Sequence, residues 1–329
     1  MPTICRHFPA LLALVFGTLA FNVNAQSPSP IASDDRAQCK AGDLVSCVRS
    51  ETARCDTGEA SVCEALSGRY YGGIAVPRDP ARGLQLWTRA IHLADSLCIT
   101  GDLGGCALAG KAYGSGHGAP LDLARAKILE ERACTGGNAD GCFNIGYASL
   151  LGMIGFERDT LRAAKLLESA CVSGHSNACF QLGWNYEMGR TVARDYERAA
   201  VFYHKACEAA GDTMGMMGCH FLGAAYDKGR GVKENAAHAA QLYDRACRGG
   251  SGSGCTNLGS YHERGRSVSK NASRAAELYE RACQLGNPSG CDNLGFLYER
   301  GDGVPRDAGR ATQLRQQACA LGFRSACKS

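Results

Sequence analysis

The stretch Cys283-Gln-Leu-Gly-Asn-Pro-Ser-Gly-Cys291 decides the fold, because its plan recurs along the whole chain. The cysteines other than Cys5 form nine pairs: Cys39/Cys47, Cys55/Cys63, Cys98/Cys106, Cys134/Cys142, Cys171/Cys179, Cys207/Cys219, Cys247/Cys255, Cys283/Cys291 and Cys319/Cys327. In all but Cys207/Cys219 the partners are eight positions apart, and an even, regularly spaced set of this kind predicts a disulfide framework.

A glycine stands three residues after the first cysteine in most pairs: Gly42, Gly58, Gly101, Gly137, Gly174, Gly250, Gly286 and Gly322, with Gly211 one position later in the longest pair. A glycine just past the last turn of a helix is the expected left-handed cap. The first cysteine therefore ends one helix and the second begins the next, so each predicted bond joins neighbouring units.

Each unit also predicts a pair of helices. From Cys98 onward the first cysteines recur every 36 or 37 residues, apart from one step of 40, and this period is typical of a solenoid. Leu294, Gly295 and Tyr298 share one helical face, and the glycine would let a second helix approach closely. After a turn at Gly301–Pro305 a second amphipathic helix follows. The predicted fold is all-α, a solenoid of about seven helix pairs.

The N-terminus predicts export. Arg6 and His7 precede an apolar stretch that ends near small residues, so we place signal-peptide cleavage after Ala25. Residues 26–38 are the predicted flexible linker, and removal of residues 1–25 takes away Cys5, leaving 18 cysteines that can all pair. The expected location is the periplasm or the exterior of the cell.

The remaining composition limits the partners. The formal net charge of +4 on 329 residues argues against nucleic acid, and no later apolar run is long enough to cross a bilayer. The sequence has no Cys-x-x-Cys motif that would indicate a metal site, so we expect no cofactor. We also expect the protein to be a monomer.

The in-phase Leu-Gly-x-x-Tyr elements and cysteine pairs of residues 63–329 resemble the Sel-one-like repeat family, a branch of the tetratricopeptide-like solenoids. The cysteine pair in each unit is most similar to the Helicobacter cysteine-rich proteins. The resemblance implies a right-handed superhelix whose concave face is lined by the first helix of each pair. It also implies protein or peptide binding there, or weak β-lactamase or penicillin-binding activity.

Three places depart from the regular repeat. Residues 39–63 hold two cysteine pairs with a short helix between them, which suits an N-terminal capping half-unit before the solenoid of residues 64–329. Ile91 occupies a cysteine position and Cys98 follows seven residues later, which predicts a second helix longer by about two turns. The third departure, residues 208–218, predicts a longer loop.

Amides recur two positions after the second cysteine, at Asn144, Gln181, Asn257 and Asn293. In related solenoids, inner-helix asparagines bind a peptide backbone, because an amide both donates and accepts hydrogen bonds. The alternative is that they serve the free N–H groups of the first helical turn. The nearby Tyr147, Trp184 and Phe296 could anchor a ligand in such a groove, or they could pack between helices.

Two motifs raise other chemistry. Ser267-Val-Ser-Lys270 matches the S-x-x-K box of penicillin-recognising enzymes, but Ser267 aligns with turn glycines and the chain has no S-D-N or K-T-G element. Met214, Met216 and Met217, followed by His220, are soft donors that could hold Cu(I), or they could fill a gap between units. Using Cys207 and Cys219 as copper ligands would break a disulfide, which counts against a Cu(I) site. Taken together, the sequence favours a non-catalytic, exported binding scaffold without a metal.

Overall fold

The computed structural model describes residues 35, 38–39, 43–153, 155–189, 192–209 and 213–328. The predicted signal peptide, nearly all of the predicted linker, Gly42 and Gly211 lie outside these residues. Within them the chain forms fifteen α-helices, one 3-10 helix and no strand: α2 (Leu44–Asp56), α3 (Ala60–Gly72), α4 (Pro80–Ile99), α5 (Leu103–Ser115), α6 (Leu123–Thr135), α7 (Ala139–Leu151), α8 (Thr160–Val172), α9 (Ser176–Met188), α10 (Tyr196–Glu208), α11 (Thr213–Lys228), α12 (Ala236–Arg248), α13 (Gly252–Arg264), α14 (Ala272–Gln284), α15 (Pro288–Arg300), α16 (Ala308–Ala320) and η1 (Arg324–Lys328).

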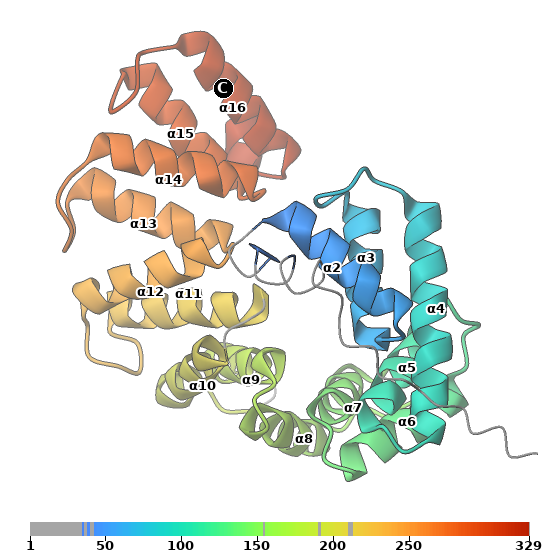
Figure 1. Ribbon diagram of the computed structural model, residues 1–329. Helices are drawn as coiled ribbons and strands as arrows, with labels where there is room; N and C mark the ends of the chain where they lie inside the picture. The colour runs from blue at the N-terminus through green and yellow to red at the C-terminus, as the bar shows by residue number, and fades with distance from the viewer. Residues whose placement is uncertain are drawn as a thin grey trace, which may run out of the picture.

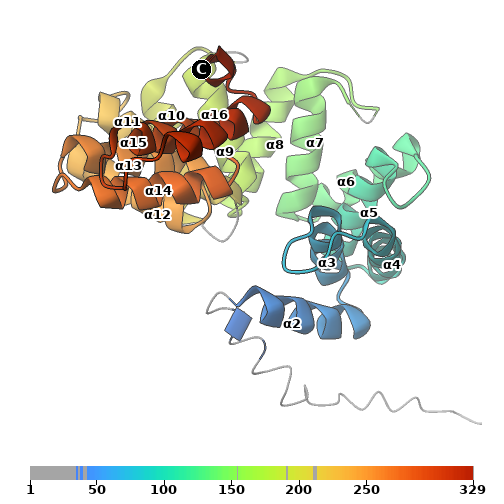
Figure 2. The same ribbon diagram turned by 90° about the horizontal axis from the view of Figure 1, so that it is seen from above.

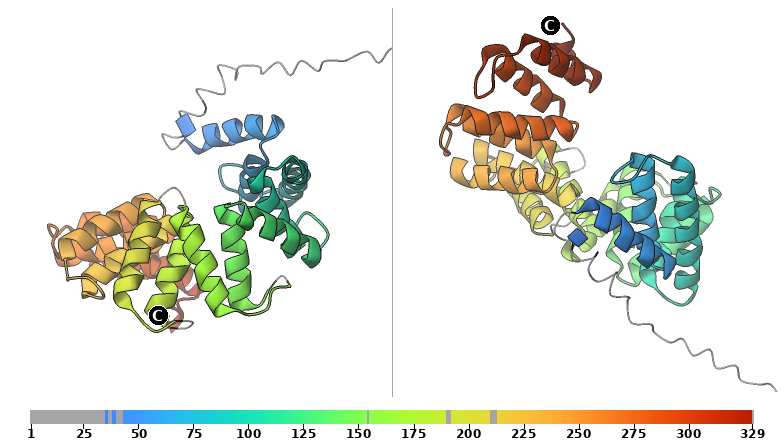
Figure 3. Two further views of the ribbon diagram at one scale, coloured as in Figure 1. Left: turned by 90° about the horizontal axis from the view of Figure 1, so that it is seen from below. Right: turned by 45° about the horizontal axis from the view of Figure 1, so that its top comes forward.

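Helix pairs stack along a curved path (Figure 1). Each odd-numbered helix from α3 packs against the even-numbered helix that follows it, and each pair packs against the next. Figure 1 shows α3, α5, α7 and α9 on the inner side of the curve and α4, α6, α8 and α10 on the outer side. Figures 2 and 3 show α2 at the N-terminal edge of the stack, where it packs on α3. The predicted all-α, right-handed αα solenoid is confirmed.

Polar caps and glycine turns fix the helix ends. The second helix of each unit begins after an Asp or Asn whose side chain accepts a backbone N–H bond, as Asp307 does from Arg310 at 2.9 Å. First helices end at glycines with positive φ, for example Gly301 at 77°. This is the conformation that only glycine adopts at low cost, so the turn residues of the sequence set the length of each helix.

All nine cysteine pairs form the predicted disulfides, and each joins adjacent helices across a turn. The bonds are Cys39–Cys47, Cys55–Cys63, Cys98–Cys106, Cys134–Cys142, Cys171–Cys179, Cys207–Cys219, Cys247–Cys255, Cys283–Cys291 and Cys319–Cys327. Cys283 lies in the last turn of α14 and Cys291 in the first turn of α15, with their Cα atoms 4.5 Å apart. The predicted left-handed glycines are confirmed at the seven described positions: Gly58, Gly101, Gly137, Gly174, Gly250, Gly286 and Gly322.

Most second cysteines lie at the end of the first turn of the following helix, a few residues later than the predicted start. Each is the fourth residue of its helix at Cys47, Cys63, Cys106, Cys142, Cys179, Cys255 and Cys291. Cys327 likewise is the fourth residue of η1, whereas Cys219 is the seventh residue of α11. The reason is the capping residue four positions before the cysteine, which starts the helix earlier, as Asn287 does for α15.

These second cysteines are also part of the core. The sulfur-bearing side chains are buried at Cys47, Cys63, Cys106, Cys142, Cys179, Cys219, Cys255 and Cys291, while Cys327 at the C-terminal edge is exposed. The disulfides therefore fill interior space between units, and they leave no buried thiol at these positions for catalysis or metal binding.

The predicted close approach of paired helices is confirmed. A Cβ atom on Gly259 of α13 would lie 2.6 Å from the ring of Tyr279 in α14. Gly183 and Gly223 face Tyr203 and Tyr243 in the same way. These tyrosines are buried, so the missing glycine side chain is the space that the large aromatic ring occupies.

The irregular units differ from one another. Helix α4 has 20 residues where other second helices have 13, which confirms the predicted lengthening after Ile91. The predicted loop between Cys207 and Cys219 is partly wrong, because α11 begins at Thr213 and carries the three methionines in its first turns. Met216 packs against Gly249, where no side chain competes for space. Three of the four extra residues therefore extend α11, which has 16 residues where α13 has 13. None of the described helices is both long and apolar enough to span a membrane.

Candidate binding surface

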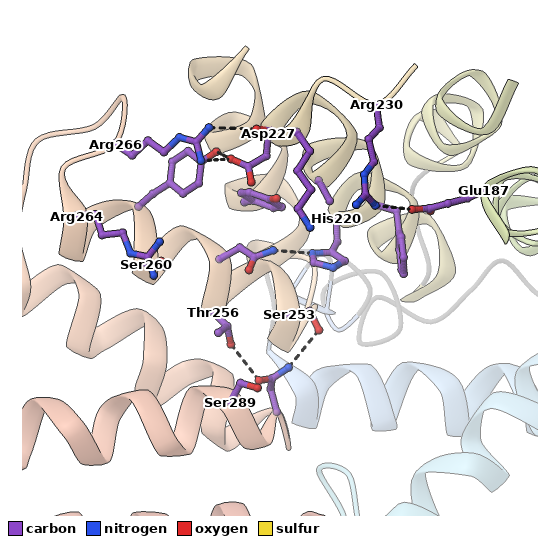
Figure 4. A pocket seen from close by; sticks show the side chains of 17 residues that line it. Glu187, His220, Asp227, Arg230, Ser253, Thr256, Ser260, Arg264, Arg266 and Ser289 are labelled. Atoms are coloured by element: carbon purple, nitrogen blue, oxygen red, sulfur yellow. Dashed lines mark hydrogen bonds and ion pairs between the residues drawn. The ribbon is translucent and has the colours of Figure 1, made fainter. Parts of the chain in front are cut away.

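Two hollowed regions lie along the first helices of the units. The C-terminal cleft has a volume of about 580 Å³ and runs from α9 to α15 (Figure 4). Its lining residues are Glu187, His220, Phe221, Ala224, Asp227, Lys228, Arg230, Tyr243, Ser253, Thr256, Asn257, Ser260, Tyr261, Arg264, Arg266, Asn287 and Ser289.

The N-terminal cleft has a volume of about 950 Å³ and runs from α3 to the start of α11. Its lining residues are Gly58, Glu59, Ala60, Ser61, Glu64, Leu97, Asp102, Gly104, Gly105, Ala107, Leu108, Lys111, Asp140, Phe143, Asn144, His175, Asn177 and Met214. Both clefts are thus lined mainly by the first helices of the units, which we call the inner helices.

Carboxylates of the C-terminal cleft are already satisfied within the protein. Asp227 accepts a hydrogen bond from the Tyr261 hydroxyl and pairs with Arg266 at 2.8 Å. Glu187 accepts from the Tyr203 hydroxyl at 2.7 Å and lies 3.6 Å from Arg230. Burial, followed by the adjacent carboxylates, raises the pKa of Tyr203 and Tyr261, so both phenols remain donors.

His220, which Figure 4 labels, and Asn257 both line the C-terminal cleft. The Asn257 Nδ2 atom is 3.5 Å from His220 Nδ1, and the imidazole packs against Phe221 and Tyr243. Burial, with a smaller contribution from Lys228, lowers the pKa of His220 to about 4. The ring is therefore neutral at pH 7 and offers a polar contact without charge.

A buried acid stands beside the N-terminal cleft. Glu130 of α6 is 2% exposed and accepts a hydrogen bond from Asn144 Nδ2 at 2.8 Å. Its other oxygen has no partner among the described residues. Burial raises the pKa of Glu130 to about 9, so the carboxyl is protonated at neutral pH. Asn144, a predicted ligand residue, thus has one amide hydrogen engaged by the protein.

His175 and Asp140 form the second polar contact of the N-terminal cleft. His175 Nε2 lies 3.3 Å from Asp140 Oδ1, and the Phe143 ring stacks on the imidazole at 4.3 Å. The hydrogen bond from His175 lowers the pKa of Asp140. His175 Nδ1 also accepts the N–H of Ala178, so the histidine caps α9.

The predicted amides occupy separate places. Asn144 lines the N-terminal cleft and Asn257 the C-terminal cleft. Gln181 lies on α9 and its amide is 3.4 Å from Asn177 Oδ1. Asn293 lies on α15, outside both linings. The alternative role in helix capping is wrong, because the caps come from residues four positions before the second cysteine, such as Asn287.

The predicted aromatic anchors divide between packing and exposure. Trp184 packs edge-on against Phe221 at 5.4 Å, next to the core, as the packing alternative predicts. Phe296 is 39% exposed, and the Arg315 guanidinium lies over its ring, 4.6 Å from the ring centre. Tyr147 is half-exposed and stacks on Phe143. None of the three lines a cleft, so any ligand contact to them would extend beyond these hollows.

Ser267 occupies a turn, with a φ of 55°, and α14 begins only at Ala272. The helical start that would bring Lys270 to the serine hydroxyl is therefore not formed here. Cys207 and Cys219 are joined in a disulfide, and the described residues contain no group of three His, Cys, Asp or Glu side chains that could hold a metal. These placements favour neither the β-lactamase nor the Cu(I) alternative.

The charged residues of the C-terminal cleft were not predicted, although the sequence carries their signal. An acid stands eight positions after the second cysteine at Glu187, Asp227, Glu263 and Glu299. Arginine stands eleven positions after it at Arg230 and Arg266. Alignment of the repeats by cysteine would have shown both sets.

Comparison with known proteins agrees with the repeat assignment. The Sel1 repeat model matches residues 61–95, 105–138, 139–175, 176–210, 217–251, 252–287 and 288–323. A Helicobacter pylori cysteine-rich protein B structure is 34% identical, with 43% of this chain and 98% of that chain covered and a TM-score of 0.34.

Two further structures have the same fold. The Oxalobacter formigenes Sel1 repeat protein gives a TM-score of 0.60 at 24% identity, covering 90% of this chain and 88% of that one. The antigen c5321 of uropathogenic Escherichia coli gives 0.63 at 22% identity, covering 90% and 65%.

A curated relative, cytochrome c oxidase assembly factor 7A of Xenopus laevis, is 30% identical over 104 residues. The match spans 31% of this chain and 42% of that protein, so well under half of that relative is covered. Because the repeat model covers most of the chain, in phase with its helix pairs and cysteines, the protein belongs to the Sel1 repeat family.

Proposed function

We propose that the protein is an exported scaffold that binds a protein or peptide on its concave surface. The observation that carries this proposal is the pair of clefts lined by the inner helices of successive units. Sel1 repeats act as scaffolds for protein interactions, and an extended inner surface can hold a segment across several units. Asn144 and Asn257 supply amides within these clefts.

The disulfides support the location. Nine bonds in one chain are consistent with an extracytoplasmic protein, because thiols stay paired in an oxidising compartment. We propose cleavage after Ala25, with a mature protein that is periplasmic or secreted and monomeric. N-terminal sequencing of the exported protein tests the cleavage site, and a mature chain that retains Arg6 would contradict it.

Site-specific photo-crosslinking tests the binding surface. A photoreactive residue replaces Asn257 in the C-terminal cleft, and a matched one replaces Val201, an exposed residue of the second helix α10. We expect position 257, and not position 201, to crosslink a discrete partner in the exporting cell. Identical products from both positions, or none from position 257, would overturn the proposal.

A further inference from the structure

Three cations recur at one place on successive inner helices. Lys228, Arg264 and Arg300 each stand nine positions after the second cysteine of their unit, near the ends of α11, α13 and α15. All three are exposed, and none has an ion-pair partner within the part of the chain that the structure describes. Neighbouring inner helices α11, α13 and α15 contact one another, so these side chains form one row.

Acidic groups within the C-terminal cleft do not neutralise this row. Asp227 is engaged by Tyr261 and Arg266, and Glu187 by Tyr203 and Arg230. Figure 4 shows the Asp227–Arg266 and Glu187–Arg230 pairs. The lining therefore carries four cations against two carboxylates, and Lys228 and Arg264 are the two cations without a carboxylate. Positive side chains concentrated in a cleft raise the local concentration of anionic ligands.

The N-terminal cleft has the opposite balance. The positions equivalent to the row are Gly72, Ser115, Leu151 and Met188, and none of these is charged. Its lining includes the carboxylates of Glu59, Glu64, Asp102 and Asp140, with Lys111 as the single lysine or arginine among its described lining residues. An acidic segment is therefore attracted to the C-terminal end of the inner surface and not to the N-terminal end, where Lys111 already pairs with Glu64.

Uncharged polar groups complete the C-terminal cleft. Asn257, Thr256 and Ser260 line it from α13. The Thr256 hydroxyl is already bonded to Gly252 O and Asn287 Oδ1, so Asn257 and Ser260 supply the hydrogen-bond donors and acceptors. These groups match a peptide backbone better than an apolar ligand. Together with the row of cations, they favour an extended acidic peptide over a hydrophobic helix.

We propose that the C-terminal cleft binds an acidic segment of a partner protein, with carboxylates paired to Lys228 and Arg264 and the backbone bonded to Asn257. Arg300 extends the row for a longer segment. This inference rests on the proposed scaffold function and specifies the chemistry of its partner at this cleft.

Fluorescence anisotropy with three labelled peptides tests the inference. The probes are an eight-residue peptide of alternating Glu and Ser and its counterparts with Gln or Lys in place of Glu. We expect the Glu peptide to bind most tightly, and to weaken as NaCl is raised. The Lys228→Gln and Arg264→Gln substitutions should each weaken it about threefold, and the double substitution about tenfold. Arg310→Gln, an exposed site at the start of the outer helix α16, is the control and should leave binding unchanged.

The inference is overturned if the Glu peptide fails to bind, or if the Gln and Lys peptides bind as tightly as the Glu peptide. It is also overturned if Arg310→Gln weakens binding of the Glu peptide as much as the Lys228 and Arg264 substitutions do. Equal binding of an oligothymidylate would overturn it too, because the site would then recognise any polyanion. If crosslinking from position 257 still captures a partner, these failures leave the scaffold proposal intact. Loss of the crosslink as well would overturn both.

Discussion

The two halves of the solenoid share a backbone plan and differ in what fills it. In the C-terminal half Tyr203, Tyr243 and Tyr279 of second helices each pack on a glycine of the first helix, and Tyr279 donates to Glu263 at 2.7 Å. In the N-terminal half the same position holds Glu130 or Leu167. The N-terminal half also exposes more apolar side chains, including Ile99, Ile128 and Leu161. The repeat therefore fixes the frame, while each half has its own interior and surface chemistry.

Replacing a glycine at a helix–helix contact should produce the largest difference in stability between the two halves. In Gly259→Ala the new methyl group meets the rigid Tyr279 ring at 2.6 Å, and we expect a loss of about 3 kcal/mol in unfolding free energy. In Gly146→Ala the nearest atom belongs to Leu167 at 3.1 Å, and the loss should be about 1 kcal/mol.

Urea denaturation followed by circular dichroism measures both changes. Gly68→Ala in α3 is the matched control, because nothing lies within 4 Å of its new methyl group. Helix propensity alone should make this control neutral or more stable by up to about 1 kcal/mol. Equal losses at positions 259 and 146 would contradict the difference between the halves.

Removing one disulfide should affect both halves alike. The Cys283→Ser, Cys291→Ser double variant opens a small loop, which costs roughly 2.5 kcal/mol on the chain-entropy model. The same change at Cys134 and Cys142 should cost a similar amount, because the loop has the same length. If the denaturant midpoint shifts for only one of the two double variants, the disulfides do not contribute equally to stability in the two halves.

Glu130 should make the stability of the N-terminal half depend on pH. Below about pH 4.5 the carboxyl is protonated in both folded and unfolded chains, and between about 4.5 and 9 only the folded chain holds the proton. Stability should therefore fall as pH rises through this window, by at most about 1.4 kcal/mol per pH unit.

Urea midpoints between pH 5 and 9 measure this slope for the native chain and for Glu130→Gln. The glutamine keeps the acceptor for Asn144 and cannot ionise, so its slope should be smaller. Tyr279→Phe, the matched change in the C-terminal half, should lower stability by about 1 kcal/mol without changing the slope. An unchanged slope in Glu130→Gln would contradict the assignment of Glu130 as a buried neutral acid.

Much of the frame could be predicted from the sequence, because it depends on local chemistry. The position of Gly286 just after Cys283 is enough to predict a helix end there. The turn that follows then predicts the disulfide between Cys283 and Cys291. The site was less predictable. Asn144 and Asn257 were found by their repeat position, but the engagement of Asn144 by Glu130 joins residues of two helices and has no sequence pattern.

The sequence by itself determined the helix pairs, the glycine turns that end them and the disulfide connectivity, since each depends on residues within a few turns of one another. Only the tertiary structure decided that α11 continues through the methionines, that Trp184 packs inward, and which charges remain unpaired. Those outcomes depend on how successive units stack. Stacking places the side chains of Asp227 and Arg266 together from separate units, and it leaves Lys228 and Arg264 facing an open cleft.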